Sequence, residues 1–464
     1  MAMQTLFKNG TLITAEGAYR ADLLIADGKI AQIAAQIAPT AATEVVDCTG
    51  RWLLPGGVDV HTHFDLPVSG TRSSDDFFSG GRAAAFGGTT THIDFAIQSK
   101  GGTLRAAYEA WRAKAEGRAV IDYGLHMTIT DLNETVEAEI AQMRDLGITS
   151  LKLLMAYKGS VMVDDATLFR VMQLAAQHDL LVMTHCENGD AIAQLQADFV
   201  AQGKVAPRYH ALSRPAVLEA EATGRALALA EVAGCALYVV HITCEGAVEA
   251  LRSARKRGVR AMGETCIQYL YLTAEALDQP DFEGAKYVCS PPLRTAHDVQ
   301  VLRAALSDGT LQVLSTDHCP FWFAGGVEGR LAGKELGRDA FTKIPNGVPS
   351  VEERLKLSAG LLEASRWVAV NCTQPARIFG LYPRKGALVI GADADLVIWN
   401  PQKEGVISAR THHMQVDYSI FEGLTYRGAP ERVYLRGKLI VLGDQWLGEA
   451  GQGEYLHRNT SAWL

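Results

Sequence analysis

Two histidines that lie one residue apart, His61 and His63, end an apolar stretch in the sequence GGVDVHTHFD, residues 56–65. The side chains of a strand alternate between its two faces, so these imidazoles point to the same side and could share one metal ion. The pair alone is a weak indication, because such histidines are also found as hydrogen-bonded core residues. Further candidate ligands must decide between the two interpretations.

Other polar residues that could bind a metal follow separate apolar stretches. Lys152 lies within SLKLLMAY, His185 ends the run LLVMTH, His241 ends the run LYVVH, and Asp317 follows LQVLST. Taken singly, His185 and His241 are typical of hydrogen-bonded histidines at the edge of a core, and Asp317 could cap a turn. Together with the first pair they make six candidate ligands at strand ends. Six such residues would rarely have arisen there independently of one another. We interpret them as a metal-binding set.

Lys152 is the most unusual of the six, because a buried ammonium among apolar neighbours is costly without a partner. One explanation is a salt bridge to an Asp or Glu. The other is that the neutral amine reacts with carbon dioxide to give a carbamate, an anion that could bridge two metal ions. The carbamate suits a two-metal site better, since a protonated lysine would repel the ions.

Elements far apart in the sequence must bring these residues together. Apolar strand candidates occur at eight places, and helix candidates such as LRAAYEAWRAKAEG and AVEALRSARKRG lie between them. Eight strand–helix units predict an α/β fold, the (β/α)8 TIM barrel, whose catalytic groups lie at the carboxyl ends of the strands. A doubly wound open sheet is the alternative, but no GxGxxG follows an early strand. The strand candidates are residues 58–64, 89–96, 120–129, 150–157, 180–186, 237–244, 259–266 and 311–317.

The two ends of the chain have a different pattern. Residues 4–54 alternate short β-rich runs with NG and DG turn signals, and residues 387–442 repeat this pattern. We expect the two segments to form one small β-sandwich. The predicted division is 1–54 and 381–442 for the two parts of the β-sandwich, 55–380 for the metal-dependent barrel, and 443–464 for a C-terminal extension.

The composition is that of an ordinary globular protein. Hydrophobic residues make up 48% and charged residues 21% of the chain, which excludes a disordered or collagen-like protein. The net charge of −8, with no Lys/Arg run that suggests a phosphate-binding surface, argues against nucleic acid as a partner and favours a small-molecule substrate. No signal peptide or membrane span is recognisable, so we expect a cytoplasmic protein without a membrane partner. The scattered cysteines are expected to be reduced, buried thiols.

Beyond these arguments, the motifs resemble those of cyclic amidohydrolases of the hydantoinase/dihydropyrimidinase family, in particular D-hydantoinases of the amidohydrolase superfamily. The resemblance extends along nearly the whole chain and includes PGGVDVHTHFDLP, SSDDFFSGGRAAAFGGTTTHIDF, SLKLLMAYKG, STDHCPF and IPNGVPSVEERL. It implies hydrolysis of the cyclic amide bond of 5-substituted hydantoins, or of dihydropyrimidines such as dihydrouracil and dihydrothymine, to N-carbamoyl amino acids. It also implies a homotetramer.

The resemblance assigns roles by matching motif. It implies that a hydroxide bridging two divalent ions, usually Zn²⁺, attacks the ring carbonyl. Tyr157 would stabilise the oxyanion, and Asp317 would carry the proton to the leaving nitrogen. Main-chain groups around Ser290 and Asn346 would hold the second amide of the ring. The implied metal ligands are His61, His63, N6-carboxylated Lys152, His185, His241 and Asp317.

Three residues near the implied substrate pocket are expected to control specificity: Leu66, Leu154 and Val161. Leu154 and Val161 are smaller than the aromatic residues expected at these positions in D-hydantoinases. We therefore expect a pocket that admits bulky 5-substituents such as aryl groups. The sequence leaves open whether hydantoins or dihydropyrimidines are the physiological substrates, and which enantiomer is preferred.

Two alternatives stay open at this point. Allantoinase, or another cyclic-amide hydrolase of the superfamily, would share the fold and the metals and differ in substrate. Dihydroorotase is disfavoured, because the segment HTHFDLP has no arginine directly after the histidines. A non-enzymatic scaffold relative of dihydropyrimidinase is disfavoured, because such proteins lose metal ligands and all six candidates are present here.

Overall fold

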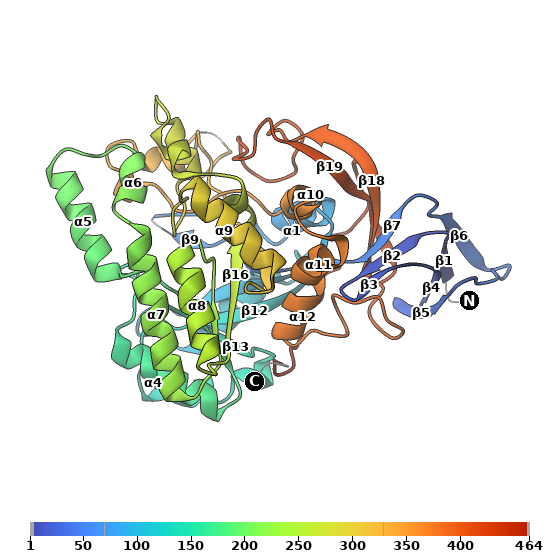
Figure 1. Cartoon of the computed structure of the whole chain (residues 1–464), viewed down its shortest axis with the longest axis horizontal. Helices are drawn as coiled ribbons and strands as arrows, with labels where there is room; N and C mark the ends of the chain where they lie inside the picture. The colour runs from blue at the N-terminus through green and yellow to red at the C-terminus, as the bar shows by residue number, and fades with distance from the viewer. Residues whose placement is uncertain (1–3, 69, 328, 462–464) are drawn as a thin grey trace.

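The fold is built around a barrel of eight parallel strands, in which each strand pairs with the next one along the chain (Figure 1). The computed structural model describes residues 4–68, 70–327 and 329–461. An isolated parallel bridge between Thr62 and His318 joins the last strand to the first. The (β/α)8 prediction and all eight strand candidates are confirmed. The strands are β8 (Gly57–Thr62), β11 (Thr89–Ile97), β12 (Asp122–Thr128), β13 (Ser150–Leu154), β14 (Leu181–His185), β15 (Leu237–Val239), β16 (Ala261–Cys266) and β17 (Val313–Ser315).

Helices follow the strands and cover the outside of the barrel (Figure 1). Local signals set their ends: Asp164 accepts a hydrogen bond from the Thr167 amide at the start of α4, and Gly234 ends α7 with φ 71°. The longer helices are α1 (Ser79–Phe86), α2 (Leu104–Ala115), α3 (Glu134–Ile140), α4 (Asp165–Gln177), α5 (Gly189–Ala201), α7 (Ala216–Ala233), α8 (Glu245–Lys256) and α9 (Ala296–Ser307). Shorter ones are α6 (Arg208–Leu212), α10 (Arg354–Ser358), α11 (Ala364–Val368) and α12 (Gln374–Ile378).

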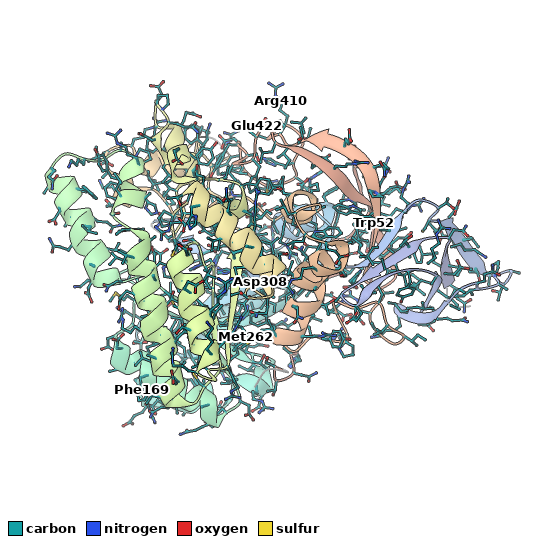
Figure 2. The ribbon with its side chains drawn as sticks, in the orientation of Figure 1. Trp52, Phe169, Met262, Asp308, Arg410 and Glu422 are labelled. Atoms are coloured by element: carbon teal, nitrogen blue, oxygen red, sulfur yellow. The ribbon has the colours of Figure 1, made fainter. Side chains whose placement is uncertain are left out.

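The inside of the barrel is a packed apolar core. Val58, Ile93, Met183 and Tyr238 meet there with Met262, which Figure 2 labels on β16. A filled interior leaves no channel through the barrel, so a reaction site can form only at an open end. The polar residues at the carboxyl ends of the strands lie above this core.

Two larger sheets lie outside the barrel, and the second of them unites the two ends of the chain. One has the strand order β5-β4-β1-β6 and the other β21-β20-β19-β18-β7-β2-β3. In the second sheet β7 pairs antiparallel with β18, so that Pro55 lies opposite Leu396. This pairing agrees with the expected β-sandwich, whereas the exact division of the chain stays a prediction. The strands are β1 (Gln4–Lys8), β2 (Thr11–Thr14), β3 (Gly17–Arg20), β4 (Asp22–Ala26), β5 (Lys29–Ala34), β6 (Thr43–Asp47), β7 (Trp52–Pro55), β18 (Leu396–Val406), β19 (Thr425–Leu435), β20 (Lys438–Leu442) and β21 (Gln445–Trp446).

A buried lysine connects the β-sandwich to the barrel. The Lys385 ammonium lies 2.5 Å from a carboxylate oxygen of Asp122, 2.9 Å from Asp393 and 2.8 Å from Asp395. Asp122 begins β12, while Asp393 and Asp395 lie just before β18. Burial works against the charge, but the three carboxylates raise the pKa of Lys385. The lysine therefore stays charged in a buried site.

Replacing Lys385 with methionine is expected to lower the free energy of unfolding by about 3–5 kcal/mol, because the change leaves buried carboxylates without a counter-ion. Urea unfolding would measure the loss. Lys438→Met is the control, since Lys438 is 49% exposed and pairs with a Glu449 that is 75% exposed; its effect should stay within about 0.5 kcal/mol. Equal stability of Lys385→Met and the parent would contradict this account.

Two expectations from composition can be compared with the structure. Among residues 4–68, 70–327 and 329–461, no helix is long and apolar enough to cross a membrane. All eight cysteines are free and buried, as expected. Burial raises the pKa of Cys186 and of Cys289 to about 12, so these two thiols stay protonated at neutral pH.

Candidate metal centre at the barrel mouth

Three of the predicted ligands form a cluster where β8 and β17 end. His61 belongs to β8, His63 follows that strand, and Asp317 follows β17. One carboxylate oxygen of Asp317 lies 3.1 Å from His61 Nε2 and 3.0 Å from His63 Nε2. The two imidazoles thus face the same side, as strand alternation predicts, and ligand atoms of all three residues lie within 4.8 Å of one another. Imidazole nitrogens and a carboxylate oxygen are a suitable donor set for a divalent metal ion.

A second pair of predicted ligands lies beside this cluster. His185 Nδ1 is 2.9 Å from His241 Nε2, and the His241 ring is stacked 5.5 Å from the ring of His61. His185 ends β14, and His241 follows β15. Burial lowers the pKa of both His185 and His241. Both imidazoles are therefore neutral at neutral pH, which is the form that binds metals.

Lys152, on β13, lies next to the first cluster. Its ammonium is 5.0 Å from the centre of the Phe95 ring, and the rings of His61 and His63 lie 4.7 and 5.0 Å from that same ring. Lys152 is only 4% exposed, and no residue of the described part of the chain forms a hydrogen bond or ion pair with its amine. Burial lowers the pKa of Lys152 to about 8. This agrees with the carbamate explanation better than with a salt bridge.

Two buried carboxylates that sequence reasoning missed hold the outer nitrogens of the histidines. Glu264 contacts His61 Nδ1, and Glu187 lies 2.8 Å from His185 Nε2. The Arg214 guanidinium, 2.5 Å away, helps to lower the pKa of Glu187 to about 2 against the effect of burial. Such partners orient a ligating histidine and fix its tautomer. Both glutamates could have been identified from the sequence, because each is a charged residue in or directly after a strand candidate: Glu264 lies within MGETC, and Glu187 ends MTHCE.

Three residues of the site have a left-handed backbone that is uncommon outside glycine. The φ angles are 69° at Tyr157, 37° at His241 and 51° at Asp317. Such conformations cost free energy and concentrate at functional sites, where the surrounding structure enforces them. Each of these residues follows a barrel strand, so the left-handed turn directs the chain away from the sheet at the mouth.

Tyr157 and Ser290, both predicted to bind the substrate, meet at the edge of the metal centre. The Ser290 side chain lies beside the Tyr157 hydroxyl, and the Tyr157 ring lies 5.4 Å from that of His185. Burial raises the pKa of Tyr157 to about 12, so its hydroxyl remains a hydrogen-bond donor. The Ser290 hydroxyl also lies 3.3 Å from His210 Nε2.

Asn346, the third residue predicted to hold the substrate, lies in an adjacent segment. The Gly347 amide donates a hydrogen bond of 3.0 Å to the Val288 carbonyl, which places the Asn346 segment against the Ser290 segment. A side chain at position 347 would lie 2.3 Å from the Cys319 carbonyl, so only glycine fits there. The structure therefore brings the predicted substrate-binding segments together.

The three predicted gate residues are half-buried: Leu154 ends β13, and Val161 and Leu66 lie in two loops. Leu154 and Val161 flank Tyr157, and a 3.0 Å hydrogen bond from the Val163 amide to the Leu154 carbonyl closes their loop. Leu66 lies before a short hairpin of β9 (Pro67–Val68) and β10 (Thr71–Arg72). The Leu66 amide donates to the Ser73 hydroxyl, 2.9 Å away, and that hydroxyl donates to the His63 carbonyl. The control of specificity by these residues stays a prediction.

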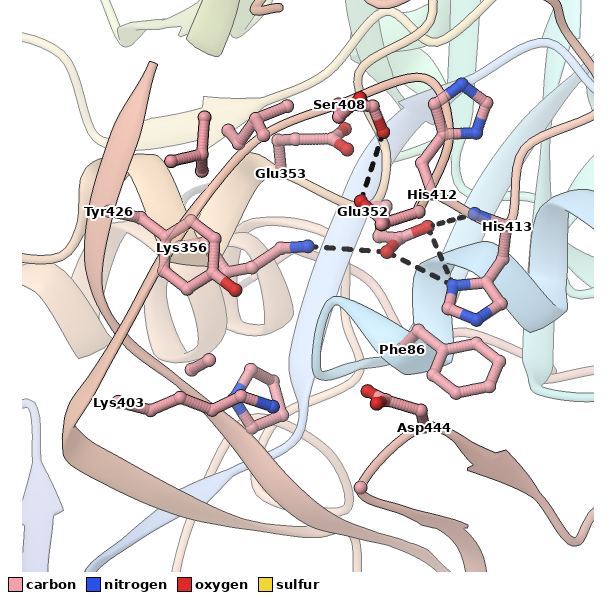
Figure 3. A pocket seen from close by; sticks show the side chains of 16 residues that line it. Phe86, Glu352, Glu353, Lys356, Lys403, Ser408, His412, His413, Tyr426 and Asp444 are labelled. Atoms are coloured by element: carbon pink, nitrogen blue, oxygen red, sulfur yellow. Dashed lines mark hydrogen bonds and ion pairs between the residues drawn. The ribbon is translucent and has the colours of Figure 1, made fainter. Parts of the chain in front are cut away.

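A separate cavity, drawn in Figure 3, is lined by none of the predicted site residues. It has a volume of about 100 Å³. The Glu352 carboxylate accepts a 2.7 Å hydrogen bond from the His413 amide and lies 3.3 Å from the Lys356 ammonium. The His413 ring stacks on Phe86 with ring centres 3.5 Å apart. These contacts fix the segment before β19 onto the start of α10, which is a structural role.

Comparison with known proteins identifies the family of the chain. Residues 52–440 match the amidohydrolase family, and the chain belongs to that family. The D-hydantoinase of Streptomyces coelicolor is 48% identical over 100% of both chains, and that of Geobacillus stearothermophilus is 49% identical over 98% of this chain and 97% of its own. The crystal structure of dihydropyrimidinase from Brevibacillus agri NCHU1002 has a TM-score of 0.96 at 46% identity, covering 99% of this chain and 100% of that one. Within the amidohydrolases, the chain is a member of the hydantoinase/dihydropyrimidinase family.

Proposed function

We propose that this chain is a cyclic amidohydrolase that opens 5-substituted hydantoins and dihydropyrimidines to N-carbamoyl amino acids. The observation that carries the proposal is the meeting of the His61–His63–Asp317 cluster with Tyr157 and Ser290 at one barrel mouth. The full-length relatives named D-hydantoinase and dihydropyrimidinase support the same reaction. They also favour this substrate class over allantoin.

We assign two divalent metal ions, preferably zinc, to the barrel mouth. The donor set supports this assignment, since neutral imidazoles and a carboxylate suit zinc and an unpaired buried amine suits carboxylation. When bound, such ions supply Lewis acidity and lower the pKa of a water molecule from about 15.7 toward about 7. The proposed ligands are His61, His63, carboxylated Lys152, His185, His241 and Asp317.

The protein's own groups would perform the proton transfers and hold the ring. Asp317 would take the proton of the attacking water and deliver it to the leaving ring nitrogen. The protonated Tyr157 hydroxyl would donate a hydrogen bond to the oxyanion that develops on the attacked carbonyl. Main-chain groups of the Ser290 and Asn346 segments would bind the second amide of the ring, which leaves the 5-substituent facing the gate loops.

The assembly and location are also proposed. The family resemblance supports a homotetramer, and a cytoplasmic location stays a prediction. The acidic net charge of −8 supports a small-molecule substrate rather than nucleic acid. A scaffold role is disfavoured, because all six predicted ligand residues are present in the sequence.

The gate prediction can be tested by measuring kcat/KM on hydantoin, 5-phenylhydantoin and dihydrouracil with metal-replete protein. We expect efficient opening of the phenyl-substituted ring, because Leu154 and Val161 leave room for it. Leu154→Phe should lower kcat/KM for 5-phenylhydantoin by about tenfold or more, while hydantoin itself is little affected. A strong preference of the parent protein for the unsubstituted rings would show that these residues do not widen the pocket.

A further inference from the structure

We propose that Lys334 is a positioning residue that holds the two substrate-binding segments, around Ser290 and around Asn346, in one fixed arrangement. The inference rests on the proposed function, because that function gives these segments the task of binding the ring. It adds a residue that lies outside the metal centre and that sequence motifs do not indicate.

The contacts of the Lys334 ammonium are complete and highly specific. Its Nζ donates hydrogen bonds to the carbonyl oxygens of Val288 at 2.9 Å, Pro345 at 2.7 Å and Gly347 at 2.7 Å. An ammonium has three donors and no acceptor, so the three carbonyls satisfy it fully. The side chain has no exposed surface, and water is therefore not an alternative partner.

The three carbonyls belong to the segments that the proposed reaction uses. Val288 lies close before Ser290, while Pro345 and Gly347 stand on either side of Asn346. The Val288 carbonyl also accepts the Gly347 amide at 3.0 Å. The Lys334 ammonium thus connects the residues on both sides of Asn346 to the segment that precedes Ser290.

The backbone of Lys334 is itself held firmly. Its amide donates a 2.8 Å hydrogen bond to the Trp322 carbonyl. The preceding Gly333 packs so closely that a side chain there would lie 2.0 Å from the same carbonyl. The Glu335 carboxylate accepts hydrogen bonds from the amides of Gly325 and Gly333. The ammonium therefore extends from a rigid base toward the two segments.

The electrostatic surroundings of Lys334 differ from those of a stabilising ion pair. Within the described part of the chain no carboxylate forms an ion pair with Lys334, whereas Lys385 has three such partners. Burial works against the charge and lowers the pKa of Lys334, whereas three carbonyl acceptors at 2.7–2.9 Å need all three donors of the protonated form. An apolar side chain of similar volume would avoid this desolvation cost. What the ammonium adds is a fixed geometry for three carbonyls of two binding segments.

Lys334→Met keeps an unbranched side chain that is one atom shorter, and removes the donors. We expect KM for hydantoin to rise about tenfold or more, with kcat within about threefold and the bound metal content unchanged, because ring binding is lost and the metal centre is not altered. Lys385→Met is the matched control: it removes an equally buried lysine, and it should lower stability while leaving KM unchanged. An unchanged KM for folded Lys334→Met would overturn the proposal.

Two further measurements keep the test decisive. Lys334→Gln retains two donors, so its KM should lie between those of the parent and of Lys334→Met. Hydrogen exchange should become faster in peptides covering 286–292 and 343–349 in both Lys334 variants and stay unchanged there in Lys385→Met. Unchanged exchange, or failure of both Lys334 variants to fold, would overturn the positioning role. Failure of the proposed function would appear differently, as a metal-replete parent that opens no ring.

Discussion

Lys152→Ala is expected to lose ring opening almost completely, with kcat/KM reduced by about 10³-fold or more. The reason is that alanine removes the side chain that carbon dioxide could convert into a bridging anion. Without that anion, the positive charges of two ions would be poorly balanced by Asp317 and the neutral histidines. Kinetics and elemental analysis on the same preparation would show whether the activity and the second metal are lost together.

Rescue distinguishes the bridge from a general structural role of Lys152. A short-chain acid such as acetate should partly restore Lys152→Ala, because its carboxylate can occupy the place of the carbamate. Lys152→Arg keeps a cation, cannot form the carbamate, and should remain inactive with or without acetate. Full activity of the alanine variant without any additive would refute the bridging role.

Asp317→Asn is expected to lower kcat by roughly 10²- to 10⁴-fold, which is the range of general acid–base catalysis. Asparagine has the shape of aspartate and also tolerates the left-handed backbone found at this position, where φ is 51°. The change therefore removes the negative charge and the proton acceptor while it preserves the local conformation. Initial rates with hydantoin at saturating concentration would measure the loss.

Asp179→Asn is a matched control for this experiment. Asp179 has nearly the same backbone angle, φ 52°, but its side chain is 65% exposed and pairs with Arg144 at the surface. We expect its kcat and its thermal stability to equal those of the parent. A kcat of Asp317→Asn within tenfold of the control would mean that another group moves the proton.

The barrel and the six candidate ligands could be predicted from the sequence alone, because the geometry of a parallel barrel relates the order of the strands to the position of the residues at their ends. In a parallel barrel the carboxyl ends of all strands meet at one mouth, so polar residues at the ends of apolar runs must converge. The ends of the strands were less accurate. The candidates 150–157, 237–244 and 311–317 are longer than the observed strands, because Tyr157, His241 and Asp317 adopt positive φ angles that are incompatible with continued pairing.

Contacts between distant polar residues could not be predicted in this way. The proximity of Tyr157 to Ser290, and the contact of Glu264 with His61, depend on how the loops and strands pack. Lys334 begins a 3₁₀ helix of four residues, Lys334–Gly337, which is too short for a periodic pattern to relate the residue to its partners. Its carbonyl acceptors are main-chain groups, which no residue type reveals. Family motifs supplied Ser290 and Asn346 but not the lysine that connects them.

The most direct test of the central claim is the rate of hydantoin ring opening by metal-replete protein, followed as formation of N-carbamoylglycine. The account predicts metal-dependent turnover that a chelator abolishes and that added Zn²⁺ restores. Absence of turnover on hydantoin, 5-phenylhydantoin and dihydrouracil, in protein shown to contain two metal ions per chain, would contradict it.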